Sequence, residues 1–237
     1  MSAQRRIVFE HIINCRDLGG YPCTGGVTQF GRLLRCGIPR DPSPGDMEKI
    51  KELGIKTVID LRGDIEAVER PSAFSYDSND IRYMQISLLE VNPAITRPDV
   101  PLRDIYTHSV ETYGENYAKV ISALAEVETP AIFHCFLGKD RTGILASMLL
   151  SLAGVCMPDI IADYQVSGTY LTPFYKKEIE EDTGLIWENS DDHLQSHPHN
   201  IETLHAFIEK KYGGVTDYLK SFGVSDEEIK RAAGLLL

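Results

Sequence analysis

One stretch constrains the fold of this chain more than any other: it reads "IFHCFLGKDRTG" and runs from Ile132 to Gly143. The apolar residues before Cys135 are typical of a short buried strand. After Arg141 the chain continues as "TGILASMLLSLAG", an apolar run of helical length. The glycine-containing segment between them is therefore predicted to form a strand-to-helix turn. Turns of this kind direct backbone N–H groups at a bound anion.

The rest of the chain alternates between strand and helix patterns. We expect strands at 55–61 and 81–89, and a helix that has Ser43 as its N-cap and ends near Gly54. Helical spacing also covers about 102–127, with a break at Gly114. This alternation predicts an α/β fold with a mixed, partly parallel central sheet flanked by helices. The 237 residues, 43% of them hydrophobic, suffice for one core, so we expect a single domain over 1–237.

The charge balance argues against one class of partner. The chain has 24 lysine and arginine residues against 35 aspartate and glutamate residues, a net charge of −11. A nucleic-acid binder usually presents a basic surface, so we expect no nucleic-acid partner.

Cysteine usage and the N-terminus bear on the compartment. Five cysteines, an odd number without metal-binding spacing, predict free thiols in a reducing compartment. The N-terminus lacks the apolar run of a signal peptide, and no segment approaches the ~20 apolar residues of a membrane span. We therefore expect a cytoplasmic protein without a membrane span; secretion by a leaderless route is the alternative.

The spacing within the turn favours chemistry on phosphorus. Five residues separate Cys135 from Arg141, and the backbone N–H groups that follow the cysteine belong to Phe136, Leu137, Gly138, Lys139, Asp140 and Arg141. Curled around one point, these donors match the oxygens of a phosphoryl group. A helix N-terminus and cationic neighbours stabilise a thiolate at Cys135, placed for in-line attack on phosphorus. The planar fork of Arg141 can hold two phosphoryl oxygens, and Thr142 can donate its hydroxyl to the cysteine sulfur.

These residues resemble a known family. The stretch "HCFLGKDRTG" is similar to the signature loop of cysteine-dependent protein tyrosine phosphatases, and most similar to that of the bacterial enzymes that also act on phosphoinositides. The stretches "NCRDLGGY" (Asn14–Tyr21), "VIDLRGDIEAVERP" (Val58–Pro71) and "ADYQVS" (Ala162–Ser167) resemble further motifs of that group. The resemblance implies a cysteine-dependent phosphatase-type α/β sandwich, a phosphocysteine intermediate, and neither metal nor cofactor. It covers about 14–171, and the residues after Thr172 match no motif.

The resemblance also implies roles for individual residues. Cys135, Arg141 and Asp140 are the expected catalytic residues, and the expected substrate-binding residues are Phe136, Leu137, Gly138, Lys139 and Thr142. In the group that this chain resembles, a lysine at the position of Lys139 binds additional phosphates of an inositol ring. His134 is expected to orient the loop backbone. Helical insertions of that group form lids, so we expect a lid-like insertion at about 92–127, with a helical C-terminal extension at about 173–237. The expected partner is a phosphorylated protein or a phosphoinositide; the sequence makes no prediction of oligomeric state.

The general acid has three candidates. Many tyrosine phosphatases carry it in a Trp-Pro-Asp loop, but the only tryptophan here, Trp187, lies downstream of Cys135. The resemblance favours Asp140. Glu90 follows a predicted strand, where dual-specificity enzymes carry their aspartate, and Asp99 stands in a Pro-Asp pair.

Other features have simpler interpretations. The segment Asp191–Asn200 contains His193, His197 and His199 beside two aspartates; it can bind a metal, but we favour a polar loop that ends with Asn200 as a helix N-cap. The remaining cysteines are expected to pack in the core, with Cys15 or Cys36 as a resolving partner for an oxidised Cys135. The alternative functions are a rhodanese-like sulfurtransferase and a catalytically silent phosphate-binding module.

Overall fold

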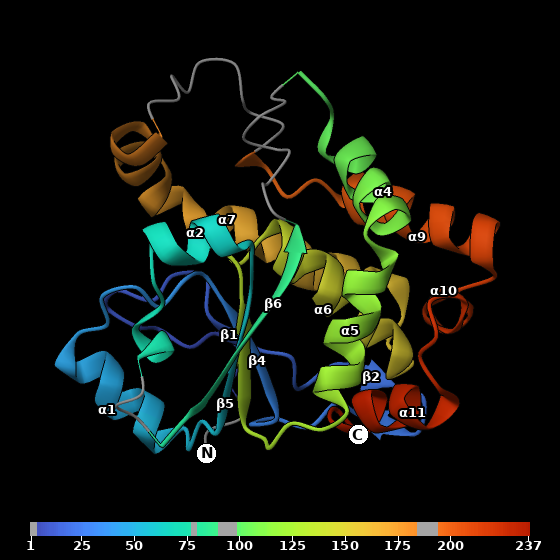
Figure 1. Ribbon diagram of the computed structural model, residues 1–237, viewed down its shortest axis with the longest axis horizontal. Coiled ribbons are helices and arrows are strands. Elements are labelled where there is room, and N and C mark those ends of the chain that lie inside the picture. The colour runs from blue at the N-terminus through green and yellow to red at the C-terminus, as the bar shows by residue number, and fades with distance from the viewer. Residues whose placement is uncertain (1–3, 77–79, 90–98, 184–193) are drawn as a thin grey trace.

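The computed structural model describes residues 4–76, 80–89, 99–183 and 194–237 (Figure 1). Five strands form a central sheet in the order β1-β4-β7-β5-β6. They are β1 (Arg16–Asp17), β4 (Leu33–Cys36), β5 (Thr57–Arg62), β6 (Arg82–Leu89) and β7 (Ala131–His134). Strand β1 runs antiparallel to β4, and the other neighbours are parallel. Strands β2 (Pro22–Cys23) and β3 (Gly26–Val27) form a separate antiparallel pair. The predicted mixed, partly parallel sheet is confirmed.

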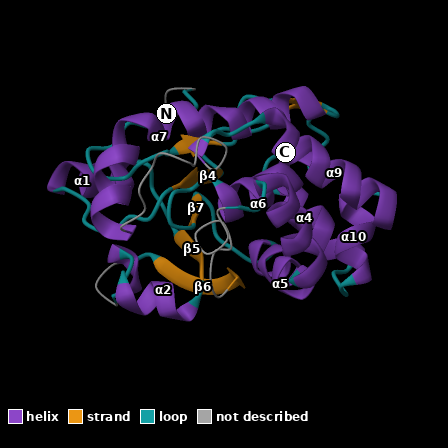
Figure 2. Ribbon diagram, turned by 90° about the horizontal axis from the view of Figure 1, so that it is seen from above, coloured by secondary structure: helices purple, strands orange, loops and turns teal. Residues whose placement is uncertain are grey.

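Helices cover both faces of this sheet (Figure 2). They are α1 (Pro44–Glu52), α2 (Asp64–Glu69), the 3₁₀ helix η1 (Ala73–Ser75), α4 (Leu102–Thr112), α5 (Gly114–Leu124), α6 (Asp140–Leu152), α7 (Met157–Thr183), α9 (Pro198–Tyr212), α10 (Val215–Ser221) and α11 (Asp226–Gly234). Figure 2 shows α1 on one side of the strands and α4, α5, α6, α9 and α10 on the other. The predicted α/β architecture with flanking helices is therefore confirmed.

Successive side chains of β5 and β7 point to opposite faces of the sheet, which explains how the sheet packs against helices on both faces. In β5, Val58 packs in the cluster that contains Ile50 of α1, whereas the next residue, Ile59, packs in the larger cluster on the opposite face. Strand β7 repeats the pattern with Ile132 and Phe133. Successive side chains of a strand point to opposite faces, so a sheet covered on both sides needs an almost continuous apolar run.

Local signals account for two of the helix boundaries. Ser43 caps α1, and its side chain accepts a hydrogen bond from the backbone N–H of Asp46, as the sequence predicted. The predicted break at Gly114 separates α4 from α5. A Cβ atom on Gly114 would lie 2.1 Å from the ring of Phe222, so only glycine allows this close approach.

The parallel strands bring their carboxyl ends to one edge of the sheet. Cys36 of β4 and Asp60 of β5 both stand in register with His134 of β7. Cys135, the next residue, therefore emerges at this edge between two neighbouring strands, the place where open α/β sheets bind ligands. Within the described ranges, no helix has the length and apolar character needed to cross a membrane.

Candidate active site

The residues from Cys135 to Arg141, here called the Cys135 loop, follow β7 and include the first two residues of α6. Cys135 is 3% exposed, and α6 begins at Asp140 rather than near Thr142 as expected from the sequence. Asp140 and Arg141 therefore belong to the first turn of a helix whose N-terminus faces the loop. The predicted strand-to-helix turn is confirmed, with its helix two residues longer at the start.

Five consecutive carbonyl groups of the loop accept hydrogen bonds from outside it. The Cys135 carbonyl accepts from His134 Nδ1 (3.0 Å), and the Phe136 carbonyl accepts from the Ile38 N–H (2.8 Å). Asn14 Nδ2 donates to the carbonyls of Leu137 and Gly138, both at 3.0 Å. Arg35 Nη2 donates to the carbonyls of Gly138 (2.8 Å) and Lys139 (3.4 Å). A trans peptide unit points its C=O and its N–H in opposite directions. With the carbonyls held outward, the N–H groups of 136–140 face the interior of the loop. This arrangement can bind an anion.

Gly138 makes the tight curvature of the loop possible. Its φ angle is +69°, in the left-handed region that favours glycine. A Cβ atom at this position would lie 2.3 Å from the carbonyl carbon and oxygen of Cys36. The loop therefore packs against the end of β4 at a distance that no side chain permits.

A buried ion-pair cluster supports the outward-facing carbonyls. Asp163 of α7 binds Arg16 Nε at 2.9 Å and Arg35 Nη1 at 2.5 Å, and all three side chains are at most 2% exposed. Arg16 also donates to Asn14 Oδ1 at 2.6 Å. Although burial opposes ionisation, the two arginines hold the pKa of Asp163 below its usual value. Asn14 of the N-terminal motif and Arg35 of β4 thus hold the loop, and Asp163 holds Arg16 and Arg35 in place.

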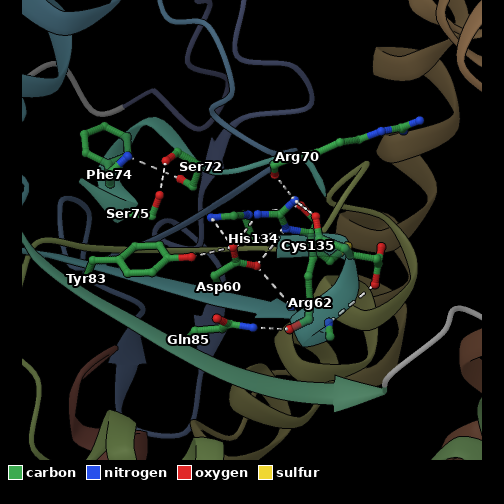
Figure 3. Close-up of polar contacts among 12 residues, drawn as sticks. Asp60, Arg62, Arg70, Ser72, Phe74, Ser75, Tyr83, Gln85, His134 and Cys135 are labelled. Carbon is green, nitrogen blue, oxygen red and sulfur yellow. Dashed lines mark hydrogen bonds and ion pairs between the residues drawn. The ribbon is translucent and has the colours of Figure 1, made fainter. Parts of the chain in front are cut away.

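A second buried cluster lies beneath the cysteine (Figure 3). Asp60 and Arg62 form an ion pair at 2.6 Å with neither side chain exposed, and the Tyr83 hydroxyl donates to Asp60 at 2.8 Å. His134 Nε2 lies 3.8 Å from Asp60, while its Nδ1 donates to the Cys135 carbonyl. Burial lowers the pKa of His134, against the opposing effect of Asp60. Through its Nδ1 hydrogen bond to the Cys135 carbonyl, His134 is placed to orient the loop backbone, the role expected from the sequence.

Glu66 of α2 fixes Arg141, a contact that the sequence analysis did not predict. The carboxylate accepts from Nη1 through Oε2 and from Nη2 through Oε1, the latter at 2.9 Å. Glu66 stands inside the quoted "DLRGDIEAVERP" motif, which was the available signal. Two buried polar atoms nearby, Arg141 Nε and Thr142 Oγ1, have no hydrogen-bond partner in the part of the chain that the structure describes. The suggested hydrogen bond from Thr142 to Cys135 is therefore not formed in this structure.

The three candidate acids are placed very differently. Asp140 is 8% exposed, and its Oδ1 accepts a hydrogen bond of 2.6 Å from the Tyr106 hydroxyl. Lys139, 1% exposed, has its Nζ 3.6 Å from the same oxygen. Asp99 is exposed in a turn before α4, and Glu90 lies outside the described residues. The structure thus brings Asp140 and Lys139 together with Cys135 and Arg141 in one loop.

The remaining sequence predictions have mixed outcomes. All five cysteines are free. Cys15 and Cys36 are buried as expected, Cys23 is half-buried, and Cys156 is exposed, so the expectation that it packs in the core is wrong. Burial and, to a lesser extent, the neighbouring Cys15 raise the pKa of the Cys36 thiol. Helix α9 begins at Pro198 with His197 as its N-cap, so the prediction of Asn200 as N-cap is wrong; proline suits the first helical turn and starts the helix earlier. His193 lies outside the described residues, and among those described no group of three or more potential ligands is placed to hold a metal.

Comparison with known proteins identifies the family. The family model described as "Tyrosine phosphatase family" matches residues 7–237. A tyrosine-protein phosphatase of Nostoc commune is 32% identical, over 78% of this chain and 67% of that protein. The triple specificity protein phosphatase PtpB of Mycobacterium tuberculosis is 31% identical, over 94% of this chain and 96% of that protein. Among solved structures, the Siw14 catalytic core matches 98% of this chain and 95% of its own at 15% identity, with a TM-score of 0.48. The chain therefore belongs to the tyrosine phosphatase family, and it is an enzyme of the protein-tyrosine-phosphatase class, a phosphoric monoester hydrolase.

Proposed function

We propose that this enzyme transfers the phosphoryl group of its substrate to Cys135 and then hydrolyses the phosphocysteine. One observation carries the proposal: five successive carbonyls of the Cys135 loop are held outward, which turns the N–H groups of 136–140 toward the interior of the loop. A phosphoryl group has three non-bridging oxygens for these donors, and a cysteine at the base of the loop lies on the line of attack.

The described residues supply each step of such a cycle. The Cys135 thiolate attacks phosphorus, a sulfur–phosphorus bond forms, and the bond to the ester oxygen breaks. Asp140 gives its proton to the departing oxygen, and the resulting carboxylate then takes a proton from the water that cleaves the phosphocysteine. The Nε edge of Arg141 binds phosphoryl oxygen in the ground state and retains it as charge develops in the transition state. Inorganic phosphate leaves, and the thiolate is restored.

The proposed substrate class is phosphotyrosine in proteins, with phosphoinositides as a second class. The family and the name of the Nostoc commune relative, a tyrosine-protein phosphatase, support phosphotyrosine. The name of the Mycobacterium tuberculosis relative, a triple specificity phosphatase, supports testing more than one type of phosphoester. The case for phosphoinositides depends on Lys139, whose ammonium lies beside Asp140 in the loop.

The first experiment measures phosphate release from phosphotyrosine, phosphoserine and phosphothreonine peptides and from mono- and poly-phosphorylated inositides. We expect the fastest release from phosphotyrosine peptides and no effect of a chelator. Release from phosphoserine peptides alone would contradict the proposed class. A parallel assay with thiosulfate tests the sulfurtransferase alternative, and a chain that binds phosphate without releasing it from any ester would be the silent module.

The second experiment tests the covalent intermediate. Rapid acid quenching during turnover, followed by peptide mass spectrometry, should find a phosphoryl group on Cys135. The Cys135→Ser variant should bind inorganic phosphate but show no turnover, because its hydroxyl stays protonated and is a weak nucleophile. Multiple turnovers by Cys135→Ser would overturn the mechanism.

A further inference from the structure

A hydrogen-bonded chain of buried side chains ends on Asp140. Asn200 Nδ2 of α9 donates to the Tyr164 hydroxyl of α7 at 3.2 Å, and Tyr164 lies 2.7 Å from the Tyr106 hydroxyl of α4. The Tyr106 hydroxyl in turn donates to Asp140 Oδ1 of α6 at 2.6 Å. Asn200 and Tyr164 are fully buried, and Tyr106 is 1% exposed. Four helices thus contribute one residue each to a path that begins in the C-terminal region, for which the sequence suggested no role.

The chemistry of the end groups gives this path a direction. The Asn200 amide nitrogen can only donate, so the Tyr164 oxygen accepts there and its own single proton is available for Tyr106. Tyr106 then accepts from Tyr164 and gives its own proton to Asp140. Burial, together with the nearby Asp140 and Tyr164, raises the pKa of Tyr106, and burial raises that of Tyr164 as well, so both phenols keep their protons. Every link therefore donates toward the carboxyl group.

The two oxygens of Asp140 consequently differ. Oδ1 accepts from Tyr106 and also faces the Lys139 ammonium at 3.6 Å. Among the described residues, no hydrogen bond reaches Oδ2. An oxygen that already accepts from a phenol and faces a cation is a poor place for a proton, so the proton of a neutral Asp140 belongs on Oδ2.

We propose that Tyr106, supported by Tyr164 and Asn200, is a positioning residue that confines the transferable proton of Asp140 to Oδ2 and fixes the direction in which that oxygen points. This inference rests on the proposed role of Asp140 as general acid. A general acid is effective only when its proton lies within hydrogen-bond reach of the departing oxygen. A carboxyl group free to rotate, or to carry its proton on either oxygen, would meet that condition only part of the time.

The test is Tyr106→Phe, which removes one oxygen and keeps the ring that packs edge-on against Tyr164, with ring centroids 6.1 Å apart. We measure kcat/KM for an alkyl phosphomonoester, a poor leaving group, and for an activated aryl phosphomonoester. We expect a loss of about tenfold for the alkyl ester, a part of the ~10²–10⁴-fold that general acid catalysis contributes, and little change for the aryl ester. Inhibition by inorganic phosphate should be unchanged, because the loop itself is intact.

Two further variants keep the test decisive. Tyr218→Phe is the matched control: it also removes a buried hydroxyl bonded to α4, at the Val110 carbonyl (2.8 Å), but it does not touch Asp140. It should affect both esters equally and weakly. Tyr164→Phe leaves Tyr106 in place, so it should give a smaller but still ester-dependent loss. If Tyr106→Phe folds poorly, the Tyr164→Phe result decides.

The outcomes separate this inference from the proposed function. Equal losses on both esters with Tyr106→Phe, or no loss on either, would overturn the positioning role even where phosphocysteine is trapped on Cys135. Asp140→Asn provides the reference, since it should show the same ester dependence in stronger form. If Asp140→Asn affects both esters alike, Asp140 is not the acid and the positioning role falls with it, while the covalent mechanism stands.

Discussion

Glu66 and the proposed phosphoryl ligand approach Arg141 from different edges of its guanidinium. Glu66 accepts from Nη1 and Nη2, whereas Nε belongs to the adjacent edge and is buried without a partner among the described residues. Burial by itself would lower the pKa of Arg141. The hydrogen bonds to Glu66 and the charge interaction with Cys135 outweigh burial and raise this pKa. The arginine therefore stays charged and keeps its carboxylate while its free edge faces the proposed phosphoryl ligand.

The variant Glu66→Gln tests this arrangement. Glutamine preserves the length of the side chain but replaces one acceptor by an NH₂ group that repels the guanidinium. A displaced Arg141 no longer meets the phosphoryl oxygens, and a misplacement of about 1 Å can cost on the order of 10²-fold in rate. We therefore expect kcat/KM to fall by about 10- to 100-fold with an unchanged melting temperature. Glu69→Gln, an exposed glutamate of the same helix, is the control. Equal kcat/KM for Glu66→Gln and wild type would mean that Arg141 needs no partner.

At the scale of elements, the loop takes its shape from the strand beside it. Gly138 combines a left-handed φ of +69° with contact at the end of β4, where its Cβ would lie 2.3 Å from the Cys36 carbonyl. The variant Gly138→Ala should therefore force the loop away from β4 and turn its N–H groups away from the interior of the loop. We expect a loss of activity of 100-fold or more, on the order seen for misplaced catalytic groups, and a lower melting temperature.

Gly25 offers a control that separates backbone strain from contact. It has a comparable positive φ of +96° in the β2–β3 turn, but a Cβ atom there would meet nothing within 4 Å. Gly25→Ala should therefore lose only the roughly 1–2 kcal/mol of left-handed strain and keep full activity. If Gly138→Ala behaves like Gly25→Ala, contact with β4 does not shape the loop.

For helices, strands and loops, the sequence predicts a feature correctly where neighbouring residues determine it. The strand, the loop and the cap at Ser43 follow from neighbouring residues, and all of them are confirmed. The start of α6 is two residues earlier than expected, because a loop and a first helical turn carry the same residue types. The cap of α9 was misplaced because Asn200, a common cap residue, is buried against Tyr164 instead. There, tertiary packing overrides the local preference.

At the scale of the whole molecule, the groups that complete the site come from distant parts of the chain. Glu66 lies 75 residues before Arg141, and Arg16 lies 147 residues before Asp163. The sequence motifs that contain Arg16 and Asp163 were recognisable by resemblance, but only the fold assigns them to each other. Asp163 joins the N-terminal segment, β4 and α7, because Arg16, Arg35 and the Tyr21 hydroxyl all reach its carboxylate.

The variant Asp163→Asn should therefore destabilise the whole fold. It leaves the buried guanidinium groups of Arg16 and Arg35 without a counter-charge, and breaking a buried ion pair in this way costs about 3–5 kcal/mol. We expect that loss in the free energy of unfolding by urea at pH 7. Asp226→Asn is the control: its ion pair with Lys220 is largely exposed, and exposed pairs contribute about 0–1 kcal/mol.

The same variant makes a prediction about pH, with a definite sign. Burial opposes ionisation of Asp163, but Arg16 and Arg35 lower its pKa below the value in the unfolded chain, which is about 3.9 for an aspartate. A carboxyl group whose pKa is lowered by folding contributes its full stabilisation above the unfolded value and loses it as the pH falls through the folded one. The difference in unfolding free energy between wild type and Asp163→Asn should therefore be constant from pH 7 to about pH 5 and shrink below about pH 4. A difference that stays constant down to pH 3 would contradict the charge-based account and place the effect in packing, because the carboxyl group of the unfolded chain already takes up protons below about pH 4.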